Sequence, residues 1–128
     1  MKVKLLSSTE NFIKVIATAA RVCYSGLPLE ELLSRYSEED DISLIKRVVG
    51  MGHLSVVEHA VFTFEVDREL KEELFKILME KPYLKISERE SSFIVSLNLR
   101  TALELISEMP ELEFVNSLKE FIPGFLIP

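Results

Sequence analysis

The chain has 128 residues, enough for one domain with its own hydrophobic core, so we expect residues 1–128 to fold as a single domain. Hydrophobic residues make up 48% and charged residues 28%, which excludes a disordered or fibrous chain, and the formal net charge of −6 argues against broad binding to nucleic acid or an anionic membrane. The single cysteine, Cys23, excludes an internal disulfide, and the lack of a signal-like N-terminus or of an apolar run of about 20 residues predicts a cytoplasmic protein without membrane spans.

The N-terminal part of the chain predicts a strand followed by a helix. Residues 3–6 are expected to form a short strand, and residues 8–11 offer hydroxyl groups suited to capping a helix. The apolar face of that helix comprises Phe12, Ile13, Ile16, Ala19 and Ala20. We expect the helix to end at residues 21–26, before Pro28.

A second helix is predicted by a clear start signal. Ser37 and Asp40 have the spacing of a capping box, in which a serine and an acidic residue three positions later satisfy the first N–H groups of a helix. The apolar residues that this helix is expected to bury are Ile42, Ile45, Val48 and Val49. The glycines at positions 50 and 52 can end it.

The second half of the chain alternates between segments with the two-residue periodicity of strands and segments with the spacing of helices. Residues 60–66 and 93–97 alternate apolar and polar side chains, which predicts two strands. Helical spacing is found in residues 70–78, 99–106 and 112–121, and the apolar tail, residues 122–128, is expected to dock on a surface such as that of another subunit. This mixed order predicts an α+β fold, a small, mostly antiparallel sheet packed with several helices.

The junction between the second helix and the next strand is the most unusual segment. Residues 50–59 hold both histidines of the chain, His53 and His59, and the glycines permit positive φ and close approach of a ligand to the backbone. A purely structural alternative is that Ser55 and Glu58, which also have capping-box spacing, begin a short helical turn.

These residues are also of the types found in two other kinds of site. His53, His59, Glu58 and Cys23 are all possible metal ligands, but side chains six positions apart lie on nearly opposite sides of a helix, so we expect no metal. Cys23 with a histidine could form a nucleophilic pair, although a lone cysteine is more often a small hydrophobic residue.

A second candidate segment lies where a strand leads into a helix. Asn98 is suited to the first position before the helix, and helix starts attract anions. Arg100 could add bidentate contacts to a phosphate. The alternative is that Asn98 only caps the helix and that Arg100 pairs with Glu104 one turn later.

Separate segments of the chain together carry a family resemblance. Residues 19–25 read Ala-Ala-Arg-Val-Cys-Tyr-Ser, residues 52–59 read Gly-His-Leu-Ser-Val-Val-Glu-His, and residues 61–64 continue as Val-Phe-Thr-Phe. Residues 96–101 lead from a strand through Asn-Leu-Arg into a helix. This pattern resembles the flavin-dependent thymidylate synthases, or thymidylate synthase complementing proteins. In that family Gly-His-x-Ser-x-x-Glu-His runs directly into a Phe-Thr-Phe strand.

The resemblance implies a cofactor and a set of residues that hold it. His53, Ser55 and Glu58 would line a flavin pocket, with FAD shared between the subunits of a homotetramer, or of a dimer. Asn98 and Arg100 would correspond to the Asn-x-Arg of the family, which also contacts FAD. Either Cys23 or Ser25 would take the place of a small polar residue close to the cofactor. The family reaction is the reductive methylation of dUMP to dTMP with methylenetetrahydrofolate, FAD and NADPH.

The sequence departs from the family in its central part. The family signature Arg-His-Arg-x-x-Ser, which belongs to the substrate site, is absent, and only residues 67–92 stand where a long substrate-binding segment is expected. The resemblance therefore implies a shortened member that keeps the FAD-binding half of the site, with no catalytic residue assigned. Two alternatives are an active enzyme in which Arg68, Arg89 or a partner chain supplies the missing arginines, and a non-catalytic oligomeric scaffold or binding protein of the same fold.

Overall fold

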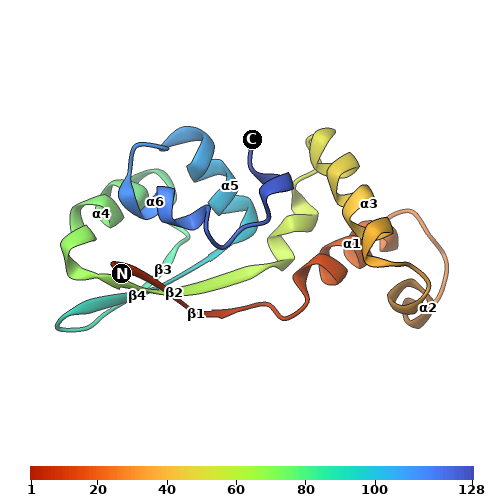
Figure 1. The fold of residues 1–128 in the computed structure, drawn as a ribbon, viewed down its shortest axis with the longest axis horizontal. Helices are drawn as coiled ribbons and strands as arrows, with labels where there is room; N and C mark the ends of the chain where they lie inside the picture. Colours follow the sequence, from red (N-terminus) through yellow and green to blue (C-terminus); the bar gives the residue numbers. More distant parts are fainter.

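The computed structural model describes all residues of the chain, 1–128, and contains one four-stranded antiparallel sheet (Figure 1). The strands are β1 (Val3–Ser8), β2 (Val61–Asp67), β3 (Lys85–Glu88) and β4 (Ser92–Asn98), in the order β1-β2-β4-β3. The predicted α+β class is therefore confirmed, as are the strands expected near residues 3–6, 60–66 and 93–97. The short edge strand β3 was not predicted.

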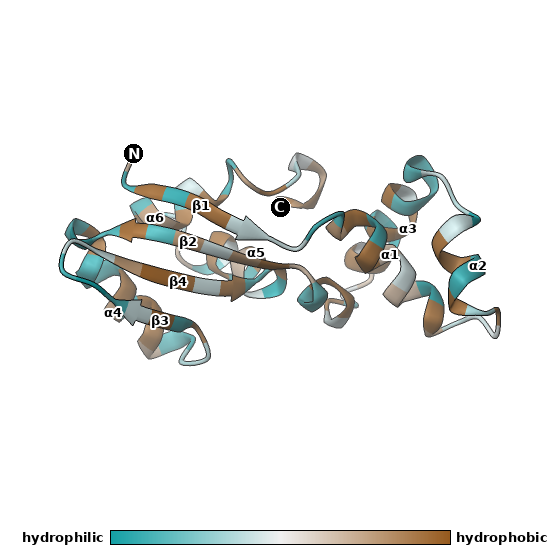
Figure 2. Cartoon of the chain, turned by 90° about the horizontal axis from the view of Figure 1, so that it is seen from below, coloured by the Kyte–Doolittle hydropathy of each residue, from teal (hydrophilic) through white to brown (hydrophobic).

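Six α-helices and three short 3₁₀ turns complete the chain. The helices are α1 (Phe12–Val22), α2 (Leu29–Ser34), α3 (Glu38–Gly50), α4 (Lys71–Glu80), α5 (Leu99–Glu108) and α6 (Glu113–Leu118), and the turns are η1 (Ser55–His59), η2 (Arg68–Leu70) and η3 (Gly124–Leu126). Helices α4, α5 and α6 cover one face of the sheet, whereas α1, α2 and α3 lie beyond one end of it (Figures 1 and 2). None of the helices combines the length and the hydrophobicity that a membrane span needs.

The core lies between the sheet and the helices that cover it. Alternate residues of β2 and β4 are buried, namely Phe62, Phe64, Val66, Phe93, Val95 and Leu97. Phe64 contacts the rings of Phe114 and Phe121, with ring centroids 6.1 and 5.3 Å away. The opposite face of the sheet is mixed: Thr63 and Ser96 share a hydrogen bond of 2.7 Å there beside Val61 and Ile94, and no helix crosses that face in Figure 2.

The two predicted helix starts had different outcomes. The capping box of α3 is present, since Ser37 Oγ accepts from the N–H of Asp40 and the Asp40 carboxylate accepts from the N–H of Ser37. The capping role expected of residues 8–11 was wrong. Thr9 Oγ1 instead accepts from the N–H of Val61 at 2.9 Å, and Asn11 precedes α1 with a left-handed φ of 53° and no capping hydrogen bond. The threonine hydroxyl thus bonds to the first residue of strand β2 and does not cap α1.

The C-terminal tail packs on its own chain. Ile122 and Leu126 are buried in the main core, and the ring of Phe125 lies 5.7 Å from Lys46 Nζ on α3. The tail therefore docks on a surface, as predicted, and this surface belongs to its own chain, because its apolar side chains pack in the main core and beside α3. Within α3, Ile45 and Val48 are buried as predicted, Ile42 and Val49 are only partly buried, and Asp41 is buried instead.

Candidate functional site

The loop that carries the histidines begins with a glycine turn at the end of α3. Gly52 has a φ of +82°, its N–H donates to the Val49 carbonyl at 2.9 Å, and the N–H of His53 donates to the Val48 carbonyl at 2.9 Å. This pair of bonds forms a Schellman motif, which requires a left-handed residue and therefore favours glycine. Gly50, in contrast, is the last residue of α3 and does not have the positive φ that the sequence permits. The turn fixes the point from which His53 projects.

The next five residues form the 3₁₀ turn η1. Val56 and Val57 are buried and hold the turn against the core, so Ser55, Glu58 and His59 are exposed. The expected short helical turn is present, but its proposed capping box is not: Leu54 occupies the position before η1, and no side chain caps it. The hydroxyl of Ser55 therefore remains available to a ligand.

His53 is held on one side by a tyrosine from the end of α1. The hydroxyl of Tyr24 lies 3.4 Å from Nδ1 of His53, and the two rings meet edge to face with centroids 6.4 Å apart. His53 is partly buried, whereas Tyr24 is 71% exposed. The contact leaves Nε2 of the imidazole free. Sequence reasoning missed Tyr24, although it lies within the matched segment 19–25.

Asn98 caps α5, as predicted from its position between strand and helix. Its Oδ1 accepts from the N–H of Thr101 at 2.9 Å, so the two N–H groups of its amide remain as donors. Immediately before this helix start, β4 pairs with β2 so that Asn98 stands opposite Val61. This register places the start of α5 beside η1.

Arg100 makes its shortest contact with Glu58, 42 residues earlier in the sequence. The distance from its Nη1 to Glu58 Oε2 is 2.6 Å, and its Nε lies 3.6 Å from Glu104 Oε2. The hydrogen bond to Glu58 is the main reason that the pKa of Arg100 is raised above its ordinary value. The predicted pairing of Arg100 with Glu104 is therefore present but secondary, and the contact with Glu58 joins the two candidate segments.

A cavity of about 460 Å³ lies around this ion pair. It is lined by Glu58, Tyr83, Asn98, Arg100, Thr101 and Glu104. Lys81 supports its far wall by hydrogen bonds of 3.1 Å to Glu104 and 3.3 Å to Glu108. Burial is the largest single influence and opposes the charged form of Lys81, but the two hydrogen bonds together with the charge of Glu104 outweigh it and raise the pKa of the lysine. Tyr83 and Lys81 belong to no motif and were not predicted.

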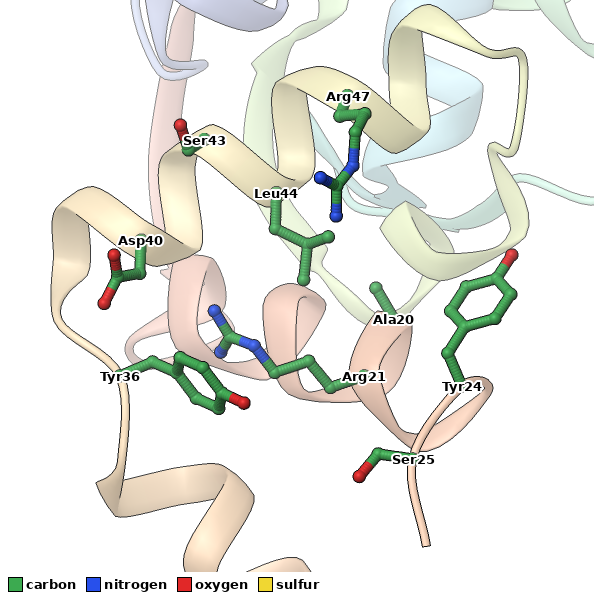
Figure 3. A pocket seen from close by; sticks show the side chains of 9 residues that line it. All are labelled: Ala20, Arg21, Tyr24, Ser25, Tyr36, Asp40, Ser43, Leu44 and Arg47. Carbon is green, nitrogen blue, oxygen red and sulfur yellow. The ribbon is translucent and has the colours of Figure 1, made fainter. Parts of the chain in front are cut away.

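Two of the predicted cofactor residues lie elsewhere. Cys23 is exposed after the end of α1, and its Sγ is 3.5 Å from the Ala19 carbonyl. Ser25 accepts from the N–H of Leu27 at 3.1 Å and borders a different cavity between α1 and α3 (Figure 3). No three histidine, cysteine, aspartate or glutamate side chains lie close enough together to hold a metal ion.

Comparison with solved structures identifies the class of this fold. Thymidylate synthase X (ThyX) from Helicobacter pylori, crystallised with FAD and dUMP, matches with a TM-score of 0.62 and 16% sequence identity, over 98% of this chain and 95% of that chain. A second crystal structure of the same protein with FAD and dUMP gives a TM-score of 0.61, also at 16% identity, over 97% and 95% of the two chains. The chain has the fold of a ThyX protein.

Sequence comparison identifies the family. Residues 4–81, more than half of the chain, match the family model described as thymidylate synthase complementing protein, and the chain belongs to this family. The resemblance inferred from the motifs is thereby confirmed. Flavin-dependent thymidylate synthase from Clostridium tetani is 40% identical over 79 residues, which are 59% of this chain and 32% of the relative.

Other relatives match over longer or shorter stretches. The enzyme of the same description from Geobacter sulfurreducens is 37% identical over 67 residues, or 52% of this chain and 29% of the relative. The one from Thermococcus kodakarensis is 27% identical over 124 residues, or 88% of this chain and 50% of the relative. The chain thus spans between about a third and a half of the length of the curated relatives that it matches.

Proposed function

We propose that this chain is a flavin-binding member of the thymidylate synthase complementing family that retains the FAD-binding half of the site. The observation that carries the proposal is the contact between Glu58 and Arg100. It brings the Gly-His-x-Ser-x-x-Glu-His loop and the Asn-x-Arg helix start, which are 42 residues apart at this contact, to one cavity. A coincidental likeness in either motif would give no reason for the two to meet.

The polar groups of the cavity fit an uncharged hydrogen-bonding ring better than a phosphate. Arg100 is already paired with Glu58 and Glu104, so two carboxylates surround one guanidinium. Such a surrounding repels a dianionic pyrophosphate, whereas carboxylate oxygens and the free Asn98 amide can bind the N–H and carbonyl edges of an adenine or isoalloxazine ring. We therefore propose that the cavity holds a ring system of FAD.

His53 and Ser55 lie on the same loop as Glu58, which lines the cavity. His53 offers its free Nε2 and Ser55 its exposed hydroxyl, and both are suited to donate to phosphate oxygens. Because the cavity is open and provided by a single chain, we propose that a second copy covers the cofactor, in a dimer or a tetramer. Bound FAD would supply hydride chemistry, and the residues of this chain would bind and orient it.

The arginines proposed as replacements for the missing substrate motif lie at the other end of the sheet. Arg68 follows the last residue of β2, whereas Asn98 stands opposite the first, so about 20 Å of strand separates them. Arg68 is also occupied, with its Nη2 2.9 Å from Glu88 Oε2 and its guanidinium against the ring of Phe93. Arg89 lies on the same distant hairpin. We therefore propose that a single chain binds flavin but does not bind the phosphate of dUMP.

A titration with FAD tests the cofactor proposal. Purified protein is titrated with FAD, and binding is followed by quenching of flavin fluorescence. Arg100→Gln should weaken binding of FAD, because it removes the ion pair that holds Glu58 in place to bind the edge of the FAD ring. Arg68→Gln is the matched control, since it removes an arginine of similar exposure, also paired with a glutamate, at the far end of the sheet. Wild-type protein that binds no FAD would refute the proposal.

An activity assay separates flavin binding from turnover. Release of tritium from labelled dUMP is measured with FAD, NADPH and methylenetetrahydrofolate present, and light scattering gives the oligomeric state under the same conditions. We expect bound flavin without tritium release. Turnover by the flavin-loaded protein would instead favour the alternative in which a partner chain completes the substrate site. An oligomer that binds neither flavin nor nucleotide would favour the non-catalytic scaffold.

A further inference from the structure

The cavity between α1 and α3 is larger than the one around Arg100, with a volume of about 670 Å³. The residues that line it include Arg21, Ser25, Tyr36, Asp40, Leu44 and Arg47 (Figure 3). Its volume lies within the range of about 300–1,000 Å³ that is usual for small-molecule sites. Apart from Ser25, no candidate site residue of the family motifs lies on its wall.

Arg21 forms a rigid wall of this cavity. Its side chain is only 9% exposed, its Nη1 is 2.6 Å from Oδ1 of the buried Asp41, and its guanidinium lies 3.6 Å from the centre of the Tyr36 ring. Lys14 binds the other oxygen of Asp41 at 2.6 Å. Asp41 thus neutralises part of the charge of two cations, and Arg21 and Lys14 also act on the carboxylate of Asp40, so Arg21 is held in place by charges on its own chain.

Arg47 supplies a second guanidinium to the same space from α3. It is exposed and makes no ion pair and no side-chain hydrogen bond within the chain. Figure 3 shows its guanidinium directed from α3 into the space between the two helices. All five of its N–H groups are therefore available to an oxyanion, in contrast to those of Arg100.

A carboxylate marks the opposite end of the cavity. Asp40 lies seven residues before Arg47 on α3, which corresponds to about 10 Å along the helix axis. Hydrogen bonds from Ser37 hold the pKa of Asp40 below its ordinary value, so the group is ionised at neutral pH. It repels a second phosphate and accepts N–H groups instead. Leu44 and the stem of Arg21 lie between the two charged ends (Figure 3).

We propose that this cavity binds a nucleoside monophosphate with an amino-bearing base. The phosphate binds Arg47, the flat base lies over Leu44 and the stem of Arg21, and the amino edge of the base donates to Asp40. The separation of the unpaired cation from the carboxylate along α3 selects a ligand with one anionic end and one N–H end. The site is separate from the cavity around Arg100 and does not depend on flavin binding there.

Titration with three related probes tests the proposal. Amide signals of isotope-labelled full-length protein are followed by NMR during addition of GMP, guanosine or UMP. GMP should shift the signals of residues 40–47 and 20–25 in a saturable manner. Guanosine, which lacks the phosphate, should bind about tenfold more weakly, and UMP, which lacks an amino group on its base, should also bind more weakly. Equal affinities for GMP and guanosine, or for GMP and UMP, would overturn the assignment.

Two variants on one helix locate the phosphate. Arg47→Gln should weaken GMP binding about tenfold. Lys46→Gln, the matched control, removes the same charge from the neighbouring position, whose side chain lies over Phe125 outside the cavity, and should leave the affinity unchanged. Equal effects of the two variants would show general electrostatic attraction and refute the site. Asp40→Asn should reduce the preference for GMP over UMP. An unchanged preference would refute the proposed contact between Asp40 and the amino group of the base.

Competition with FAD distinguishes the two cavities. GMP should still bind when FAD is saturating, and GMP binding should persist in the Arg100→Gln variant. Competitive displacement of GMP by FAD would place the mononucleotide in the flavin site and overturn the proposal. A protein that binds GMP but not FAD would refute the flavin proposal alone.

Discussion

Replacement of Asp41 by asparagine should cause a large loss of stability. The carboxylate is 1% exposed and lies 2.6 Å from both Lys14 Nζ and Arg21 Nη1. Without it, two cations that are 18% and 9% exposed face each other with no counter-charge. Breaking a buried ion pair in this way costs about 3–5 kcal/mol, and the partial exposure of Lys14 favours about 3 kcal/mol. With an unfolding entropy of roughly 0.27 kcal/mol/K for a chain of this size, Tm should fall by about 11 °C.

Urea unfolding followed by circular dichroism measures this loss. Glu39→Gln, on the exposed side of the same helix, is the control and should change the free energy of unfolding by less than about 0.5 kcal/mol. In the double variant with Arg21→Gln, the two losses should be much less than additive, because the second change removes one of the unpaired cations. A loss below about 1 kcal/mol for Asp41→Asn would refute the role of this carboxylate in holding α1 against α3.

Three further changes test other parts of the fold. Gly52→Ala should lower the free energy of unfolding in urea by about 1–2 kcal/mol, because its φ of +82° strains any residue with a Cβ; an unchanged value would exclude a strained turn before His53. Ser37→Ala should cost about 1 kcal/mol at pH 7. The backbone N–H of Ser37, which the variant keeps, is the main cause that lowers the pKa of Asp40 from 3.8, and the lost side-chain hydrogen bond is the second cause. The part of the difference from wild type that comes from this second cause should shrink below pH 3.8, and a difference that grows would contradict the sign. Leu126→Ala should lower the free energy of unfolding by about 2–4 kcal/mol at every protein concentration, because the side chain is buried in the core of its own chain. A loss that depends on protein concentration would indicate that the tail packs in a subunit interface.

Strands and helices with strong periodicity could be predicted from the sequence, and weak ones could not. The alternation in β2 and β4 arises because one face of each strand meets the core, and this burial leaves a clear pattern in the sequence. β3 has four residues, of which only Ile86 is partly buried, so no pattern marks it. The hydroxyl of Thr9 could serve either a helix start or a strand, and only the tertiary pairing with Val61 decides between them.

The candidate site was predicted as separate segments, and their meeting could not be read from either one. The capping role of Asn98 follows from local geometry and was expected. The contact between Glu58 and Arg100 depends instead on the pairing of β2 with β4, in which Val61 stands opposite Asn98. A shift of the register by one residue would turn the side chains of one strand to the other face and separate the two segments. Register is a property of the assembled sheet, so this contact needed the structure.

The two proposed ligand sites are linked by a single side chain. Tyr24 borders the cavity between α1 and α3, while its hydroxyl lies 3.4 Å from Nδ1 of His53 in the Gly-His-x-Ser-x-x-Glu-His loop. His53 is in turn fixed to the end of α3 by the turn at Gly52, which follows Arg47 by five residues. A ligand that holds Arg47 and Tyr24 in one position therefore restricts the imidazole as well. By linkage, any factor by which bound flavin changes the affinity for the mononucleotide equals the factor by which the mononucleotide changes the affinity for flavin, and a factor of one would show that the two sites are independent.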